Sequence, residues 1–326
     1  MSQAEFSWHK QPWSQIQSMQ EQGRIPHAIL ISGRAGLGKQ AFANSLIDSI
    51  LCSQPKPGFD ACGSCHSCQL RAADTHPDHT EISPEAPGKQ IKVDQIRELK
   101  EAQSLMPKVS TAKTVLITEA DQMNVSAYNS LLKLLEEPRD NTVLILLTRN
   151  RDQLPVTIKS RCQTVTIPVP VMAMALSWLK TQDASFSDEQ WHTLLKLTQG
   201  APLAAVDLGE AGLEQQQHLM RDIASLMRAQ ANPITMAAAW QSFDLKSVLL
   251  QIQAMMQAKI SSLLQNDAEI SAAVIAQYWH IVDCITHTIK LISSQNNPNK
   301  TLLIEDFMVK IMQHASQIQH LQGMYR

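Results

Sequence analysis

The chain has 326 residues, a length typical of two or three domains, and 44% of them are hydrophobic, enough to form sizeable cores. It carries 28 Lys and Arg against 30 Asp and Glu, which gives a formal net charge of −2 and a pI near 6.6. A protein that grips DNA by itself usually has a basic excess. The charge balance therefore disfavours a stand-alone DNA-binding protein, and we expect any DNA contact to be local or shared with other subunits.

The start of the chain and its apolar runs indicate neither secretion nor membrane insertion. The first thirty residues carry Lys10, Glu21 and Arg24 and show no long apolar run. We see no apolar stretch of the roughly eighteen residues that a membrane span needs. We therefore expect a cytoplasmic protein with no membrane partner. Cysteines in that reducing compartment are poor disulfide candidates, and clustered ones more often bind a metal.

Short apolar runs recur in the first half of the chain and are typical of strands. The strongest is Val143–Leu147, and helical patterns separate the runs. Hydrophobicity that is continuous rather than alternating indicates strands buried on both faces, as in a parallel sheet. We therefore predict an α/β fold with a five-stranded parallel sheet and right-handed crossovers. The other strands are expected at Ala28–Ile31, His79–Ile82, Thr114–Ile117 and Thr164–Ile167, with helices at about 37–52, 93–105 and 124–137.

The pattern changes to nearly all helix after Pro168. Residues 169–208 contain short helical stretches with a break at Gly200–Pro202. From residue 209 onward, apolar residues recur at spacings of three and four, for example from Val248 to Leu264. A polar segment at 293–300 predicts a loop, and a last helix is expected to run to about 321. We therefore predict three domains, at 1–168, 169–208 and 209–326.

A glycine-rich loop follows the first predicted strand and opens a helix. Gly33, Gly36, Gly38 and Lys39 form the pattern Gly-x-x-x-x-Gly-Lys, which is the phosphate-binding loop in the context that supports it. Its backbone N–H groups, the helix N-terminus and the lysine charge attract a polyphosphate. The next residue should be Ser or Thr, whose hydroxyl binds magnesium, but it is Gln40. Binding of ATP or ADP stays open at this point, as does a glycine-rich turn without a ligand.

The end of the third predicted strand resembles the acidic strand end of such ATPases. An active site needs an acid directly after the apolar run to hold the metal's water shell, but Thr118 is there. Glu119 occupies the next position, which activates the attacking water, and Asp121 lies further on. Both magnesium-handling positions, 40 and 118, are therefore altered. These changes predict phosphate binding at most, without hydrolysis.

Four cysteines are clustered between the first and second predicted helices. Cys52, Cys62, Cys65 and Cys68 have the spacing C-x9-C-x2-C-x2-C. Four thiolates satisfy the tetrahedral preference of zinc, and no open coordination position is evident, so we predict a structural zinc site. An iron–sulfur cluster or reduced buried thiols are alternatives, and His66 or His76 can replace a ligand.

Three segments resemble bacterial clamp-loader subunits of the AAA+ family. They are Asn129–Pro138, Leu154–Cys162 with its Ser-Arg-Cys segment, and His27–Leu30 before the glycine-rich loop. This resemblance covers about residues 24–168. It implies an AAA+ P-loop domain at 1–168 with an inserted zinc module at about 52–68. It also implies a small helical lid at 169–208 and a helical collar at 209–326 that assembles into a five-subunit ring.

The resemblance also implies roles for single residues. Arg161, positioned by Ser160 and Cys162, is expected to reach the ATP of a neighbouring motor subunit as an arginine finger. Thr148 occupies the sensor position at the end of the strongest strand. The motor's second sensor arginine falls at Leu203, which cannot contact a phosphate.

The altered positions favour a non-hydrolysing subunit of the DNA polymerase III clamp loader. Its implied partners are the gamma or tau motor subunits and the delta subunit and, through the complex, the sliding clamp and primed DNA. The chain is then part of a DNA-directed DNA polymerase (nucleotidyltransferase) holoenzyme without turnover of its own. An active gamma- or tau-type ATPase motor is one alternative. A zinc-dependent nucleic-acid-binding adaptor is the other, and salt-dependent DNA binding by the isolated chain discriminates it.

Overall fold

The computed structural model describes residues 6–23, 25–86, 88–103, 106–138, 141–228, 230, 232–241, 243, 245–265, 272–292 and 299–324. It contains two compact units, Met1–Gly209 and Glu210–Arg326. The boundary falls inside α9 (Pro202–Met227), where Gly209 has the non-helical angles φ 48° and ψ −143°. The predicted further division of the first unit at residue 168 stays a prediction.

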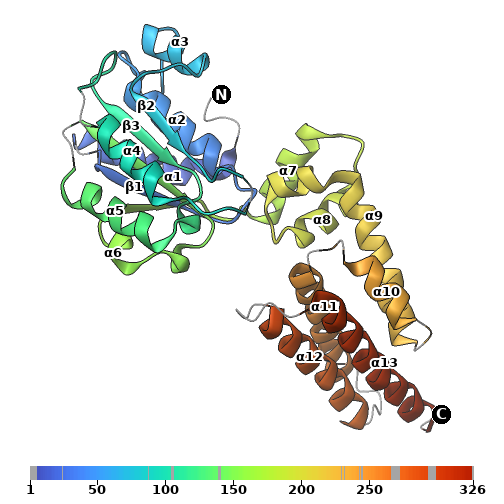
Figure 1. Ribbon diagram of the computed structural model, residues 1–326. Helices are drawn as coiled ribbons and strands as arrows, with labels where there is room; N and C mark the ends of the chain where they lie inside the picture. The colour runs from blue at the N-terminus through green and yellow to red at the C-terminus, as the bar shows by residue number, and fades with distance from the viewer. Residues whose placement is uncertain are drawn as a thin grey trace. The chain divides into compact units, whose positions relative to one another are not determined.

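The first unit is built on a five-stranded sheet (Figure 1). The strands lie in the order β2-β3-β4-β1-β5, and all neighbours are parallel. The central strands β1 and β4 pair with Ile29 opposite Ile145. The predicted parallel sheet and its five strands are thus confirmed. The strand bounds are β1 (Ala28–Ser32), β2 (His79–Ile82), β3 (Lys113–Ile117), β4 (Thr142–Thr148) and β5 (Gln163–Thr166).

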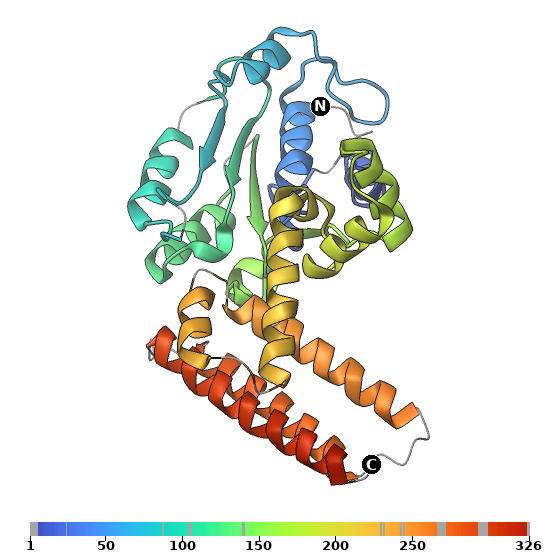
Figure 2. The same cartoon turned by 90° about the vertical axis from the view of Figure 1, so that its right-hand side faces the viewer.

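Helices cover both faces of the sheet, which explains the continuous apolar runs. On β1, Ile29 and Ile31 pack into the core that contains α1 (Lys10–Glu21) and α2 (Lys39–Leu51). Ala28 and Leu30 point to the opposite face, because successive strand side chains alternate. That face is covered by α4 (Val93–Gln103), α5 (Val125–Glu136) and α6 (Val156–Lys159). Figure 2 shows the blue α2 on one side of the strands and the teal and green α4 and α5 on the other.

Four further helices complete the first unit: α3 (His66–Ala72), α7 (Met172–Gln182), α8 (Asp188–Leu197) and the beginning of α9. The ring of Trp178 on α7 lies 5.5 Å from the rings of both Phe6 and Trp8, measured between centroids. This contact joins α7 to the N-terminal segment. Gly200, with a φ of 85°, follows the end of α8, in agreement with the predicted break.

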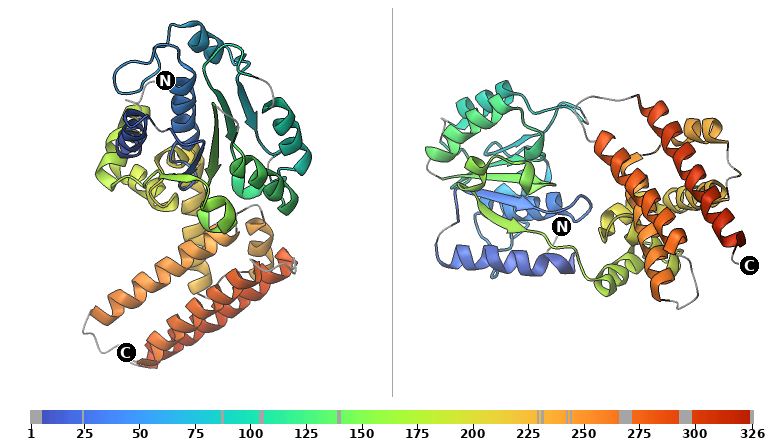
Figure 3. Two further views of the ribbon diagram at one scale, coloured as in Figure 1. Left: turned by 90° about the vertical axis from the view of Figure 1, so that its left-hand side faces the viewer. Right: turned by 90° about the horizontal axis from the view of Figure 1, so that it is seen from below.

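The second unit contains the rest of α9 together with α10 (Pro233–Trp240), α11 (Leu245–Gln265), α12 (Ala272–Ile292) and α13 (Lys300–Met324). Trp240 and Phe307 are buried at its centre, and the Trp240 indole donates to Asp222. Figure 3 shows α12 and α13 side by side. Residues 293–298 of the predicted loop lie outside the described residues, and α13 extends to Met324 rather than about 321. Among the helices that the structure describes, none is long and apolar enough to span a membrane.

Candidate functional site

The glycine-rich loop joins β1 to α2, as the sequence predicts. Gly36 and Gly38 adopt left-handed angles, with φ of 75° and 80°, a region that glycine enters without steric cost. Lys39 begins α2. The loop therefore has the position and the backbone of a phosphate cradle at a helix N-terminus.

The chain's own atoms occupy the surroundings of this loop. The Lys39 ammonium donates to the Arg34 carbonyl over 2.7 Å. The Leu37 carbonyl accepts from the indole of Trp8 at 3.0 Å and from Nε2 of His9 at 2.8 Å. The loop is thus held by hydrogen bonds within the protein at two of its carbonyls, those of Arg34 and Leu37. The sequence did not identify the roles of Trp8 and His9, because a side chain that bonds a carbonyl leaves no pattern in the sequence.

The start of α9 lies directly against the loop. The Leu203 N–H donates to the Gly36 carbonyl over 3.1 Å. A Cβ atom added to Gly36 would lie 2.5 Å from the Cβ of Ala204. Leu203, at the expected sensor position, therefore contacts the loop through its backbone, and its apolar side chain brings no charge to a phosphate.

Lys39 is partly removed from water. Burial is the main cause, and Arg149 a second, that lower the pKa of Lys39 from its ordinary 10.5 to about 8, against the opposing effect of Asp121. Within the described residues, no carboxylate lies within ion-pair distance of Lys39. The cost of keeping this cation charged is therefore not offset by a direct ion pair.

The two altered magnesium positions are engaged elsewhere. The Gln40 amide donates to the Glu81 carboxylate on β2 over 3.5 Å. Thr118 donates to the Ile82 carbonyl through its N–H at 3.0 Å and its hydroxyl at 3.5 Å. Both side chains thus donate hydrogen bonds to groups of β2.

The remaining acidic and sensor residues also have protein partners. Glu119 forms an ion pair with Arg149, and an Asp121 carboxylate oxygen accepts the Arg149 N–H over 3.3 Å. Thr148 is buried, and its hydroxyl accepts the Asn150 N–H over 3.1 Å. Sequence reasoning did not identify Arg149, whose role depends on strands β3 and β4 being neighbours.

Arg161 follows the short helix α6 and lies near the end of α5. Its guanidinium pairs with Glu136 at 2.7 Å and donates to the Thr157 carbonyl at 3.1 Å. Ser160 is the C-cap residue of α6, and its hydroxyl donates to the same carbonyl. Cys162 is buried in the core, and burial raises the pKa of its thiol to about 11. The Arg161 side chain is thus half-exposed. It directly precedes the buried Cys162, and its guanidinium is held by Glu136 and the Thr157 carbonyl.

The four clustered cysteines converge as their spacing predicts. Cys52 caps the end of α2, Cys65 caps the start of α3, and all four sulfur atoms lie within 4.8 Å of one another. The Sγ atoms of Cys52 and Cys65 are 3.9 Å apart, as are those of Cys62 and Cys68. A tetrahedral zinc with Zn–S bonds of about 2.3 Å needs sulfur atoms about 3.8 Å apart. The thiol set therefore fits a tetrahedral metal ion.

Backbone N–H groups point at these sulfur atoms. The N–H groups of Ser64 and Cys65, at 3.4 and 3.3 Å, lower the pKa of the Cys62 thiol. Burial is the main cause that raises the pKa of Cys68, to about 12. His76 is not a ligand of this group, because both its ring nitrogens have other hydrogen-bond partners. Within the part of the chain that the structure describes, these four cysteines are the group that can hold a metal.

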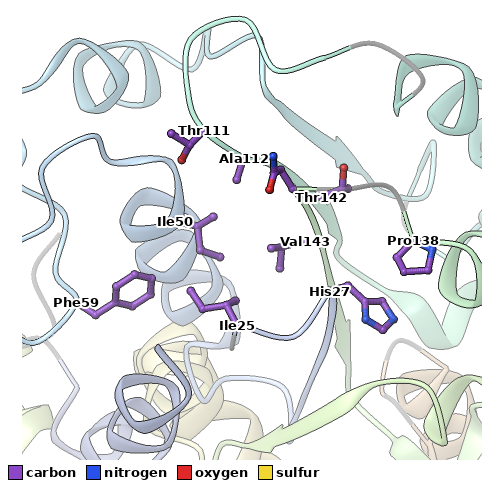
Figure 4. Close-up of a pocket in the computed structure, with 10 residues that line it drawn as sticks. Ile25, His27, Ile50, Phe59, Thr111, Ala112, Pro138, Thr142 and Val143 are labelled. Carbon is purple, nitrogen blue, oxygen red and sulfur yellow. The ribbon is translucent and has the colours of Figure 1, made fainter. Parts of the chain in front are cut away.

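A separate cavity of about 450 Å³ lies at the amino ends of β1 and β4 (Figure 4). Its walls include Ile25, Ile50 and Phe59, and His27 with a buried Nε2 that has no hydrogen-bond partner in the structure. The phosphate loop follows the carboxyl end of β1, so this cavity lies at the other end of the same strands. None of the predicted site residues lines it.

Comparisons with known proteins show the family of the chain. A family model described as DNA polymerase III, delta subunit, matches residues 8–170, which include the phosphate loop, the cysteine cluster and Arg161. The Pseudomonas aeruginosa DNA polymerase III subunit delta′ is 37% identical over 74% of this chain and 72% of its own length. The chain belongs to the DNA polymerase III delta′ family.

Other delta′ proteins match over a smaller share of their length. The Escherichia coli delta′ subunit is 34% identical over 62% of this chain and 60% of its own length. A Bacillus subtilis tau subunit is also similar, 32% identical over 45% of this chain. A Thermotoga maritima protein related to the gamma subunit aligns over 93% of this chain with 20% identity and a TM-score of 0.49.

Proposed function

We propose that this delta′-family chain is the non-hydrolysing subunit of a clamp loader. In that role it supports the loading of a sliding clamp onto primed DNA. The observation that carries the proposal is the engagement of the phosphate loop by the chain itself. Lys39 donates to Arg34, and the N-terminal turn of α9 donates to Gly36. A triphosphate would have to draw the Lys39 ammonium away from the Arg34 carbonyl, and the segment that lies against Gly36 carries the apolar Leu203 in place of a cation.

The magnesium chemistry supports the same proposal. A metal ion that bridges the outer phosphates needs a hydroxyl after the lysine and an acid at the strand end. Gln40 and Thr118 replace these groups and bond to strand β2 and its end. Glu119, the remaining acid, is neutralised by Arg149. Without a placed metal and a free carboxylate, hydrolysis at this loop loses its main electrostatic support.

We further propose that Arg161 acts on the ATP of a neighbouring motor subunit. Its ion pair with Glu136 is a surface pair, with 36% and 49% of the two side chains exposed. Such pairs contribute only about 0–1 kcal/mol, so a phosphate presented by another subunit can replace Glu136 at little cost. An arginine placed beside a transferring phosphoryl group raises its rate by about 10³-fold or more.

The four-cysteine site is proposed to hold a structural zinc. Closed sites of four thiolates are typical of zinc, and the sulfur spacing fits its tetrahedron. In this proposal residues 169–208 form a lid and residues 209–326 a collar that packs on the gamma or tau and delta subunits of a five-membered ring.

Reconstitution with the gamma or tau and delta subunits tests the proposal. We expect the purified chain to show no ATPase activity alone and to co-elute with the other subunits on size-exclusion chromatography. Its addition should increase DNA-stimulated hydrolysis by the motor subunits. DNA-stimulated turnover by the isolated chain would instead identify it as an active motor.

A further inference from the structure

A buried polar cluster lies beside the four cysteines and is not part of them. The imidazole of His76 is 2.7 Å from the Ser67 hydroxyl and 3.1 Å from the Ser110 hydroxyl. Both hydroxyls donate to the Leu51 carbonyl, at 2.7 and 3.0 Å. Ser67 and His76 are only 3% and 5% exposed. Leu51, Ser67, His76 and Ser110 thus form one hydrogen-bonded cluster, in which the two hydroxyls lie between the imidazole and the main-chain carbonyl.

The hydrogen bonds assign the proton on His76. Its Nδ1 accepts the Asp78 N–H over 3.1 Å, so the proton of the neutral ring is on Nε2. Nε2–H then donates to the Ser67 hydroxyl, whose own proton is given to the Leu51 carbonyl. Every donor in this series of hydrogen bonds has an acceptor. A buried polar network stabilises one arrangement under that condition.

The cluster is not a hydrolytic Ser-His-Asp arrangement. The Asp78 carboxylate accepts the N–H groups of Lys108, Val109 and Ser110, at 2.6, 2.7 and 2.8 Å. It therefore orients the loop that carries Ser110, and the imidazole receives only the Asp78 backbone N–H. No hydroxyl is activated here, because both donate to a carbonyl.

The positions of the anchored residues connect the cluster to the metal site. Leu51 directly precedes Cys52, at the end of α2, and Ser67 directly precedes Cys68, in α3. Cys52 and Cys68 are the two buried members of the set, and the sulfur atoms of Cys52, Cys62 and Cys65 accept N–H groups from other members. The cluster therefore fixes the main chain next to both buried ligands.

We infer that His76 is a positioning residue for the four-cysteine metal site, acting through Ser67 and the Leu51 carbonyl. The inference rests on the proposed metal site. Loss of the imidazole removes the Nε2–H donor that holds the Ser67 hydroxyl and opens space beside it, so the bond from Ser67 to the Leu51 carbonyl, which joins α3 to the end of α2, is held less firmly. Outer-shell residues that orient ligands typically change metal affinity by about 10- to 100-fold when removed.

Zinc release from His76→Ala tests this inference in the full-length chain. Zinc transfer to a chromophoric chelator is followed for the wild type and the variant. We expect release to become about 10- to 100-fold faster in His76→Ala, with one zinc per chain still bound at the start. His66→Ala is the matched control, since His66 is an exposed histidine in the same module, and it should release zinc at the wild-type rate.

Two further variants separate positioning from general stability. His76→Gln keeps an N–H donor for the Ser67 hydroxyl and should recover part of the affinity. Ser67→Ala combined with His76→Ala should be no worse than His76→Ala alone, because the two residues act as one unit. If His76→Ala fails to fold, His76→Gln and Ser67→Ala are compared by zinc release and by the cobalt(II) absorption spectrum of the thiolate site.

The outcomes are distinct. A wild-type chain that binds no zinc overturns the proposed metal site itself, before any variant is made. The positioning role is overturned if His76→Ala releases zinc at the wild-type rate. It is also overturned if the effects of Ser67→Ala and His76→Ala on zinc release are additive. Lower thermal stability of the metal-free variants with unchanged zinc affinity also overturns it, since it would assign the cluster to folding alone.

Discussion

The main-chain N–H of Leu203 donates a 3.1 Å hydrogen bond to the carbonyl oxygen of Gly36. In nucleotide-binding proteins this type of loop holds phosphates. Here one of its carbonyls accepts a hydrogen bond from the first turn of α9. Ala204, the next residue, fills the space above Gly36. The glycine-rich loop and the first turn of α9, which are far apart in the sequence, are thus joined by a hydrogen bond and by close packing.

Gly36→Ala should destabilise the chain by about 2–4 kcal/mol, as measured by urea unfolding. The substitution adds the cost of a left-handed residue, about 1–2 kcal/mol, to that of overpacking against Ala204. Gly23→Ala is the matched control, because Gly23 has a φ of 66° and nothing within 4 Å of an added Cβ. Equal losses in the two variants would contradict a close contact with α9.

Lys39→Met should stabilise the chain by about 1 kcal/mol at pH 7, a value reduced for the partial exposure of Lys39. The pKa of Lys39 falls from 10.5 to about 8 on folding, so the unfolded chain binds the proton more tightly. The resulting penalty is fully present below pH 8 and disappears as the pH rises toward 10.5. The advantage of the variant should shrink over that window in denaturant titrations.

The lysine prediction has its own control. Lys92→Met removes an exposed lysine that pairs with Glu85 and reproduces the loss of one positive charge. A stability gain of Lys39→Met that is constant from pH 7 to 10 would contradict the lowered pKa. A loss of stability at pH 7 would show that the bond to Arg34 outweighs the cost of burial.

Asp78→Asn should cost about 2–4 kcal/mol of unfolding free energy, because an amide nitrogen would face N–H groups that now donate to a carboxylate. Burial alone would raise the pKa of Asp78, but the N–H groups of residues 108–110 outweigh it and the pKa is lowered. The stabilisation is therefore present above the ordinary carboxyl pKa of about 3.9 and is lost as the pH falls through the lowered value.

Thermal unfolding between pH 7 and 3 checks this prediction. Asp74→Asn is a suitable control, because Asp74 is exposed and has a φ of 53°, a conformation that asparagine also tolerates. The difference between wild type and Asp78→Asn should narrow in acid. A difference that widens as the pH falls would reverse the assigned direction.

Arg161→Ala should slow ATP hydrolysis by the assembled loader without changing its composition. Loss of the charge that stabilises the transferring phosphoryl group should lower the hydrolysis rate at the neighbouring site by about 10³-fold or more. Single-turnover hydrolysis and size-exclusion chromatography measure the two effects separately. Arg97→Ala, which removes an exposed arginine paired with Asp94, should change neither. An unaltered hydrolysis rate in Arg161→Ala would remove the finger assignment.

The sheet and its helices were predictable because their determinants are local. Apolar runs such as Val143–Leu147 are continuous since both faces of each strand are covered, and the glycines and Lys39 identify the loop between β1 and α2. The spacing of the four cysteines was sufficient to predict their convergence. These features depend on residues close together in the chain or on one pattern repeated along it.

The partners of the site residues were not predictable in the same way. The pairs Arg149–Glu119 and Arg161–Glu136 join residues brought together by strand order and helix packing. The bond from His9 to the Leu37 carbonyl uses a main-chain acceptor that every residue possesses. The sequence suggested His76 only as an alternative metal ligand, because it does not reveal that both ring nitrogens form hydrogen bonds.

The order β2-β3-β4-β1-β5 has a consequence for synthesis on the ribosome. β1 is made first, but its two partners, β4 and β5, are completed only at residue 166. At about 5–20 residues per second, this largely apolar strand waits on the order of 10 s for its neighbours. The cysteine module, whose ligands all lie between residues 52 and 68, can close during that interval. With the proposed metal bound, the turn between α2 and α3 would form before β1 has either of its neighbouring strands.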